Sequence, residues 1–481
     1  MSNNWMTRRS VFLATYGCQM NERDSEEVLG MLTAQGYSVT EKPETADVIL
    51  LNTCSVREHA EERAVGKMFE LCELKQEKPD LVLGIIGCMA KLQQEKLFKR
   101  LPKIDLVAGP AELYDLPYLL AEIQEKRQQM MAVARPVRPL EMKQHDFHRP
   151  GVTAFVTIME GCDKACAYCI VPMTRGREVS RPAQDILAEI NRLVDAGYQE
   201  VTLLGQNVNS YGKRFPDGTG YQGPLGRMRL LEEEPESLFD FPKLLRLIDS
   251  RTGIKRVRFT TSHPIDATDR LFAAMEECES VCESLHLPVQ SGSNRILRMM
   301  KRGYTVEAYQ KKIEALRVRV PDISLSTDII IGFPGETDDD FEATVRLMEA
   351  VRFDQAYIFK YSPRPGTSAA AKEDDVAKEI KEARNQRLLA LQEGIGLRRH
   401  QALEGSQAEI LVEGQGRLER QWFGKSRGNH AVIVESPDNL LGQLVPVRVT
   451  RGTAHTVFGE IACIGSSPLS VQPQWGSPPS R

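Results

Sequence analysis

The sequence lacks the features that direct a protein to or through a membrane. Its first residues, 1–5, have neither the positive charges nor the apolar run of a signal peptide, and no run of about 18 apolar residues occurs. A positive charge excess is also missing, because 62 Lys and Arg stand against 66 Asp and Glu, for a net charge of −4. We expect a soluble, cytoplasmic protein without membrane contact, whose nucleic-acid binding, if any, rests on local basic patches.

The ten cysteines are a poor fit to a disulfide framework. The cytosol is reducing, so cysteines in that compartment serve metal binding or catalysis more often than cross-linking. The chain of 481 residues is longer than one ordinary domain and is expected to form about two to four units. The spacing of the cysteines is therefore the main guide to function.

The first part of the sequence has the pattern of a parallel α/β sheet. Apolar runs at 11–14, 48–51 and 82–86 are separated by helix-like segments at 24–35 and 61–75. Such alternation is typical of a sheet whose strands all run in one direction. We therefore predict an N-terminal parallel α/β domain.

A cysteine follows each of these apolar runs within a few residues, at Cys18, Cys54 and Cys88. The carboxyl ends of parallel strands lie along one edge of a sheet, so the three sulfurs are expected to converge there. Three ordinary buried cysteines at strand ends fit the same spacing. The spacing alone leaves a metal site and structural thiols as alternatives.

A second α/β unit begins after residues 121–150, which lose clear periodicity and are predicted to be a linker. Its strands alternate with helices, which fits an incomplete βα barrel or a doubly wound sheet, and the pattern does not choose between them. The predicted strands are 152–159, 200–204, 256–260, 284–289, 323–331 and 355–361. The predicted helices are 182–196, 239–249, 267–279, 304–318 and 338–352.

The chain changes character after a charged helix at 379–399. Short apolar runs between glycine-rich turns there predict a small β-barrel of the OB type. Within the second unit, 212–236 is rich in glycine and proline and is predicted to be an inserted surface loop. The Ser- and Pro-rich tail from 465 is predicted to be disordered. The predicted barrel strands are 409–412, 431–434, 445–449 and 455–459.

The most specific chemical pattern is a C-x3-C-x2-C triplet, Cys162, Cys166 and Cys169, directly after the strand predicted at 152–159. Three thiolates at this spacing can hold three irons of a [4Fe-4S] cluster and leave the fourth iron open. A zinc site would need a fourth cysteine or histidine, and none lies in the same loop. The triplet therefore favours an iron–sulfur cluster.

This triplet, with the aromatic Tyr168 before its last cysteine, resembles the radical S-adenosylmethionine (SAM) superfamily. The resemblance implies a partial (βα)6 barrel in which SAM binds the open iron and is cleaved, after one-electron reduction, to a 5′-deoxyadenosyl radical. That radical removes hydrogen from an unactivated C–H bond, while the protein positions the cofactor and excludes water.

Further motifs resemble the methylthiotransferase branch of this superfamily, and most closely its bacterial members that act on isopentenylated adenosine beside the tRNA anticodon. The resemblance implies thiomethylation of that adenine at C2, with two SAM molecules per turnover. The motifs are 16–21, 52–57, 174–178, 204–211, 261–264 and 359–367. The implied division is a cluster domain at 9–125, a radical SAM core at 148–400, a TRAM RNA-binding domain at 403–466 and a disordered tail at 467–481.

The same resemblance implies that Cys18, Cys54 and Cys88 hold a second, auxiliary [4Fe-4S] cluster. Sulfur is a soft ligand suited to iron, and a sulfide held there can take a methyl group from SAM before it meets a substrate radical. An adenine in an anticodon loop turns out of its stack at lower cost than one in a duplex. The expected partners are therefore tRNA and a reductant such as flavodoxin or ferredoxin, and we expect a monomer.

Residues that hold SAM are harder to assign. Superfamily members often use a Gly-Gly-Glu turn after the second strand, but this chain has Gly205-Gln206-Asn207 there. The candidates are Gln206, Asn207, Gln290 and Asp328, each of which is also explained as a turn or cap residue. The turn at 332–336 suits backbone contact with adenine and equally suits an ordinary βα connection.

The C-terminal barrel resembles the TRAM domain, an RNA-binding module. Basic side chains with interleaved aromatics suit looped RNA, whose bases can be splayed and stacked, although an ordinary solvated face has the same composition. The candidate RNA-binding residues are Arg417, Arg420, Lys425 and Arg427, with Trp422 and Phe423 for stacking.

The remaining cysteines and two histidines are predicted to be structural: Cys72, Cys278, Cys282, Cys463, His263 and His286. Alternative functions are methylthiotransfer to threonylcarbamoyl-adenosine in tRNA or to a ribosomal-protein aspartate. An iron–sulfur RNA-binding redox sensor without catalytic activity is the alternative from another class, and absence of SAM cleavage would favour it.

Overall fold

The computed structural model describes residues 9–55, 58–136, 147–215 and 239–462. Within these ranges, none of the helices combines the length and the apolar character that a bilayer crossing requires. The predicted surface loop from residue 216 onward and the predicted tail at 467–481 lie outside them.

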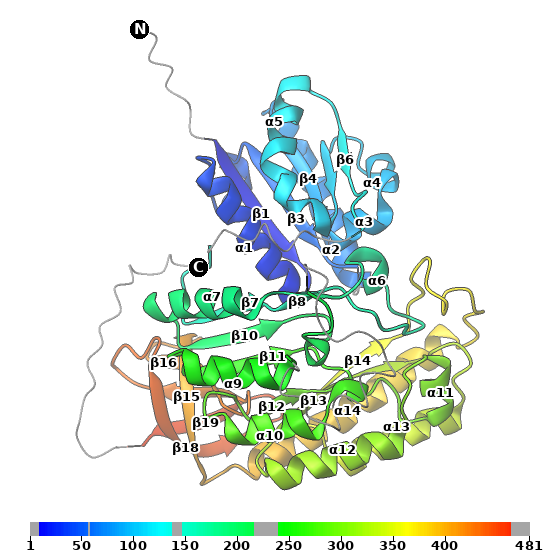
Figure 1. Cartoon of the computed structure of the whole chain (residues 1–481). Coiled ribbons are helices and arrows are strands. Elements are labelled where there is room, and N and C mark those ends of the chain that lie inside the picture. The colour runs from blue at the N-terminus through cyan, green and yellow to red at the C-terminus, as the bar shows by residue number, and fades with distance from the viewer. Residues whose placement is uncertain (1–8, 56–57, 137–146, 216–238, 463–481) are drawn as a thin grey trace.

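The N-terminal domain is a six-stranded parallel sheet in the order β2-β1-β3-β4-β5-β6 (Figure 1). Both faces are covered, which explains why the central strands are apolar throughout. Helices α1 and α5 pack on one face and α2 on the other. The elements are β1 (Ser10–Tyr16), α1 (Gln19–Ala34), β2 (Ser38–Val39), β3 (Val48–Thr53), α2 (Glu58–Leu71), β4 (Val82–Gly87), β5 (Leu106–Ala108) and α5 (Leu116–Lys126).

The linker predicted over 121–150 is wrong in its first part. Helix α5 continues to Lys126, and β6 (Met130–Ala132) then pairs in parallel with β5. A three-residue edge strand carries too little apolar periodicity to be recognised in the sequence. The sheet therefore extends past residue 125, where the N-terminal domain was expected to end.

The second domain confirms the expected partial barrel. Two parallel three-stranded sheets, β7-β10-β11 and β12-β13-β14, are joined by a bridge between Val257 and Val281. The strands follow one another in chain order, whereas a doubly wound sheet would reverse from its middle. They are β7 (Thr153–Thr157), β10 (Glu200–Leu204), β11 (Arg256–Thr260), β12 (Ser284–His286), β13 (Ser324–Ile331) and β14 (Gln355–Lys360).

Helices enclose the outer face of this barrel, as the periodicity predicts (Figure 1). Alternate strand residues such as Val257 and Phe259 join the helices in the main apolar core, so Arg256, Arg258 and Thr260 face the opposite side. This strand therefore contributes polar side chains to the interior of the barrel. The helices are α7 (Ala183–Asp195), α9 (Phe241–Arg251), α10 (Asp269–Glu277), α12 (Val306–Arg319) and α13 (Asp338–Val351), followed by α14 (Lys378–Gln401).

The C-terminal domain is a closed five-stranded barrel in the order β15-β16-β17-β19-β18, which confirms the predicted small β-barrel. Its strand β16 was not predicted, because its polar residues and central glycine give no apolar run. Inward-facing valines and Ile410 fill the barrel. The strands are β15 (Gln407–Gln415), β16 (Gln421–Ser426), β17 (Ala431–Glu435), β18 (Leu444–Gly452) and β19 (Val457–Ile461).

This C-terminal barrel covers the amino-terminal ends of the strands in the second domain. Arg258, at the middle of β11, donates to the carbonyls of Ser426 and Arg427 at 2.6 and 2.8 Å. Arg256 donates to the carbonyls of Lys425 and Glu409 at 2.8 and 2.9 Å. Anything that binds at the carboxyl ends of the strands therefore lies at the opposite end of the partial barrel from this domain.

Candidate active site

The structure brings Cys18, Cys54 and Cys88 to the carboxyl ends of β1, β3 and β4, which are neighbours in the sheet. A hydrogen bond links the thiols of Cys18 and Cys54 and lowers the pKa of Cys18 to about 6. Cys88 lies close enough to Cys18 for the two to interact electrostatically, and burial raises its pKa. The expected convergence of the three sulfurs is thus present.

Two buried asparagines hold these strand ends in place. Asn21 accepts from the backbone N–H and the thiol of Cys18 at 3.4 and 3.3 Å, and its amide donates to Asn52 at 3.0 Å. Asn52 donates back to the carbonyl of Asn21 at 2.8 Å. A side chain at Gly87, where φ is +93°, would meet Asn52 Oδ1 at 2.3 Å. The motif residues around these cysteines are therefore positioning residues.

The second set, Cys162, Cys166 and Cys169, lies in the loop between β8 (Met159–Glu160) and α6 (Val171–Thr174). Backbone bonds fix this loop on both sides, because Ala167 N–H donates to Met300 at 2.9 Å and its carbonyl accepts from Ala369 at 2.8 Å. Burial raises the pKa of Cys162 to about 12 and of Cys169 to about 11. A metal held by these thiols would have to displace their protons.

Both sets fit an iron–sulfur cluster better than a single ion. No group of three His, Cys, Asp or Glu side chains in the described ranges is close enough to chelate one metal ion. A cluster is larger and is held at its separate iron corners by three or four thiolates. Three thiolates in each set suit a cluster with one open iron.

A buried arginine joins the two cysteine sets. Arg175 follows Cys169 by six residues, and its guanidinium bonds Asp24 on α1 at 2.6 Å. Glu160 lies 4.0 Å from it. Burial alone would lower the pKa of Arg175, but Asp24, followed by Cys88, Glu160 and Cys18, raises it above its usual value. The loop that carries one set is thus tied directly to the site of the other.

The four predicted SAM contacts differ in their surroundings. Asn207 is buried, and its side chain is hydrogen-bonded within the protein: it donates to Asp266 at 2.6 Å and accepts from His263 N–H at 3.1 Å. Gln290 bonds through its backbone to Asp328 O and Ile330 N, both at 2.9 Å. Gln206 Oε1 is buried and has no hydrogen-bond partner among the residues that the structure describes, so its acceptor is unmet there. Asp328 is half-buried, 3.5 Å from His286.

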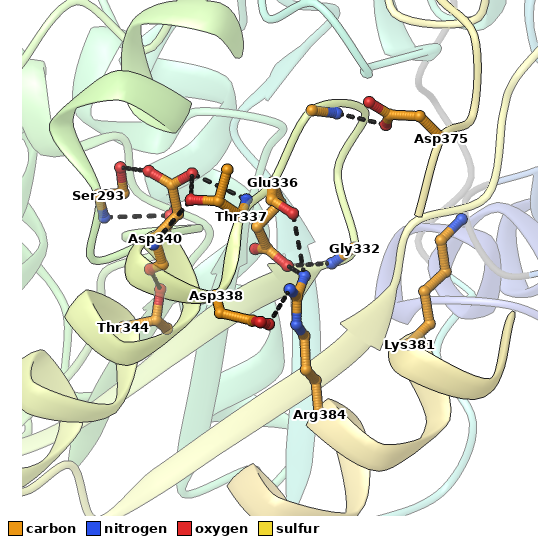
Figure 2. A network of polar contacts seen from close by, with 12 residues as sticks. Ser293, Gly332, Glu336, Thr337, Asp338, Asp340, Thr344, Asp375, Lys381 and Arg384 are labelled. Atoms are coloured by element: carbon orange, nitrogen blue, oxygen red, sulfur yellow. Dashed lines mark hydrogen bonds and ion pairs between the residues drawn. The ribbon is translucent and has the colours of Figure 1, made fainter. Parts of the chain in front are cut away.

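The turn at 332–336 is held by a polar network drawn in Figure 2. Glu336 accepts from Gly332 N–H at 2.7 Å and pairs with Arg384 of α14 at 2.7 Å. Gly335 N–H donates to Asp375 at 2.6 Å. These contacts fix the backbone of the turn, as recognition of a flat ligand by backbone groups requires.

The predicted RNA-binding side chains fall into two groups. Arg417 and Arg420 are exposed in the turn between β15 and β16. Lys425 pairs with Glu413 at 3.1 Å, and Arg427 bonds Glu283 of the second domain at 2.6 Å. Arg427 is therefore engaged in domain packing, and sequence alone gave no sign of that partner.

The residues predicted to be structural are placed as follows. Cys72, Cys278 and Cys282 are buried free thiols, and Cys463 lies outside the described ranges. His263 is buried and accepts from Ile265 N–H at 3.3 Å, while His286 is half-buried and contacts Ser326 at 2.9 Å.

Three family models match the chain in succession. Residues 10–109 match the uncharacterized protein family UPF0004, residues 156–348 the radical SAM superfamily and residues 401–462 the TRAM domain. The chain is also similar in fold to the radical S-adenosylmethionine methyltransferase TsrM from Kitasatospora setae, with a TM-score of 0.55 at 15% identity, covering 75% of each chain.

Proteins of named function align with nearly the whole chain. The chain is 45% identical over 456 residues to the tRNA-2-methylthio-N(6)-dimethylallyladenosine synthase of Carboxydothermus hydrogenoformans, covering 93% of this chain and 98% of that one. It is 44% identical to the protein of the same name from Aeromonas hydrophila, covering 94% and 91%. The chain therefore belongs to the family of tRNA-2-methylthio-N(6)-dimethylallyladenosine synthases, which are radical SAM enzymes.

Proposed function

We propose that this chain converts N6-dimethylallyladenosine at position 37 of tRNA, next to the anticodon, into its 2-methylthio derivative. The relatives that match nearly its whole length are named for this product. The structural observation that carries the proposal is the position of Arg175. It lies in the segment that follows one cysteine set and contacts the residues around the other. A transfer that uses two metal centres on one substrate atom needs them close together.

Under this proposal Cys162, Cys166 and Cys169 hold the radical SAM [4Fe-4S] cluster, and Cys18, Cys54 and Cys88 hold the auxiliary one. When bound, these clusters and two SAM molecules supply the electron transfer, the sulfur and the methyl group. The chain itself fixes the cysteine loops, buries the thiols and excludes water. Gln206, with its unpaired oxygen, and the turn at 332–336 are the proposed SAM contacts.

The tRNA is proposed to contact the C-terminal barrel through Arg417 and Arg420, which are exposed. Arginines on a turn suit phosphate contacts, which contribute affinity rather than sequence selection. The target adenine would leave its stack to reach the carboxyl ends of the barrel strands. We further propose a cytoplasmic monomer reduced by a flavodoxin or ferredoxin.

Anaerobic reconstitution tests this function. The full chain is loaded with iron and sulfide and incubated with SAM, dithionite and tRNA that carries N6-dimethylallyladenosine, and nucleosides are analysed by mass spectrometry. The 2-methylthio nucleoside together with 5′-deoxyadenosine supports the proposal. Formation of 5′-deoxyadenosine alone would direct the search to threonylcarbamoyl-adenosine or a ribosomal-protein aspartate, and neither product would favour a redox sensor.

A further inference from the structure

A second buried arginine, Arg302, lies directly against the C-x3-C-x2-C loop. It follows α11 (Asn294–Met299) and is 5% exposed. Its Nη1 donates to Cys166 Sγ at 3.2 Å. In the same segment, the carbonyl of Met300 accepts the backbone hydrogen bond from Ala167 N–H. The loop is therefore fixed at two points by one short stretch of chain.

The other nitrogens of Arg302 fix its orientation. Nη2 donates to the carbonyl of Pro288 at 2.9 Å, and Nε donates to the Tyr304 hydroxyl at 3.0 Å. The guanidinium also lies 5.4 Å from the centre of the Tyr304 ring. All three nitrogens are thus engaged, and the group that faces Cys166 has little freedom to turn away.

Arg302 is unusual because its charge has no carboxylate partner in the part of the chain that the structure describes. Its hydrogen-bond acceptors are a carbonyl, a phenol and a thiol. Arg175, in contrast, is paired with Asp24 and lies near Glu160. A buried, unpaired guanidinium is costly, so its counter-charge must come from something else at this site.

We propose that Arg302 is a positioning residue that sets the reduction potential of the radical SAM cluster, through its hydrogen bond to Cys166. This inference rests on the proposed assignment of Cys162, Cys166 and Cys169 as cluster ligands. Reduction adds one electron from an external one-electron donor and makes the cluster with its thiolates more negative by one charge. A cation that donates to a ligand sulfur stabilises that more negative state and raises the potential.

Removal of this charge should therefore make the cluster harder to reduce. For the full chain carrying Arg302→Gln, we expect the ratio of reduced to oxidised cluster to fall about tenfold at a fixed potential, which is about 59 mV for a one-electron couple. Arg302→Lys keeps the charge and should lie between the two. Lys301→Gln is the matched control, because it removes the same charge from the adjacent, exposed position and should leave the potential unchanged.

The potential is measured by an EPR-monitored redox titration of the reconstituted full chain, in which the signal that changes on SAM addition identifies the radical SAM cluster. Iron content and the SAM dissociation constant are measured in parallel. A lower potential with unchanged iron content and SAM affinity supports the proposal. Lower SAM affinity at an unchanged potential overturns it and would make Arg302 a SAM-binding residue instead.

Two further outcomes separate the inference from the proposed function. If Arg302→Gln cannot hold the cluster, Arg302→Met, which also removes the charge, carries the test, and a potential equal to that of the unchanged chain overturns the proposal. If the unchanged chain itself binds no cluster at Cys162, Cys166 and Cys169, the proposed function fails as well. A variant with a lowered potential should also regain 5′-deoxyadenosine formation when the reductant is made stronger.

Discussion

Arg175 and Asp24 form a buried ion pair of 2.6 Å between residues 151 positions apart, and this pair joins the N-terminal sheet to the loop after Cys169. Both side chains are almost fully buried, at 3% and 1% exposure. The pair therefore acts at the boundary where the two cysteine sets meet. Its geometry leads to the first prediction.

Asp24→Ala should destabilise the chain by about 3–5 kcal/mol, because it leaves the Arg175 guanidinium buried without its nearest counter-charge. The measurement is the midpoint of urea unfolding. The double variant Asp24→Ala/Arg175→Met should recover part of that loss, since it removes both charges. The exposed pair Arg100–Glu62 is the control, and Glu62→Gln there should cost less than about 1 kcal/mol.

Loss of single cluster cysteines should separate the two half-reactions. Cys18→Ala is expected to keep SAM cleavage to 5′-deoxyadenosine and to abolish the methylthio product, with bound iron reduced by about half if each site holds one [4Fe-4S] cluster. Cys166→Ala should abolish both products. Cys72→Ala, a buried thiol outside both sets, should keep both. Radical cleavage by the Cys166 variant would contradict the assignment of the main cluster.

The burial of His430, which contacts His400 at 3.2 Å, should make stability depend on pH. Burial lowers the pKa of His430 from 6.5 to about 4, with His400, Arg399 and Arg258 opposing its charge and Asp354 favouring it. Because the unfolded chain binds this proton more readily, His430 contributes stability that is complete above about pH 6.5 and is lost as pH falls toward 4.

We expect this effect to reach about 2 kcal/mol. Urea unfolding at pH 7, 5.5 and 4.5 measures it, and His430→Gln should flatten the difference relative to the unchanged chain. An equal pH dependence in the variant would show that other groups are responsible.

Arg417 and Arg420 should contribute to tRNA affinity. Their double replacement by Gln is expected to weaken binding at every sequence and to reduce the magnitude of the slope of log K against log salt by about 2. Fluorescence anisotropy with labelled tRNA at several salt concentrations provides the measurement. Arg448→Gln is the control, because Arg448 is also exposed but is paired with Glu460 at 2.9 Å. Equal loss in both variants would argue against a specific contact at the β15–β16 turn.

The sequence predicted the parts of the fold that have strong local patterns. The central strands β3 and β4 are buried on both faces and therefore appear as unbroken apolar runs. Strands β2, β5, β6 and β16 were missed, because the first three have only two or three residues and β16 has no unbroken apolar run. Helix boundaries within the second domain were predicted to within a few residues.

Within the candidate site, the cysteines were predictable from their spacing, whereas the arginines around them were not. Arg302 lies 136 residues from Cys166, and no local pattern indicates that contact. Arg175 lies in the motif at 174–178, but its partner Asp24 lies in another domain. Arg427 was expected to meet RNA, yet its partner Glu283 appears only when the two domains are seen packed together.

The C-terminal barrel lies at the amino-terminal ends of the strands, so the length of the strands separates it from the site at their carboxyl ends. Strand β13 has eight residues, which correspond to about 26 Å at about 3.3 Å per residue. A substrate held by the C-terminal barrel and acted on at the far ends of the strands must span a length of this order. A free nucleoside cannot do so, whereas a folded RNA hairpin can, so the enzyme would measure the size of its substrate as well as its chemistry.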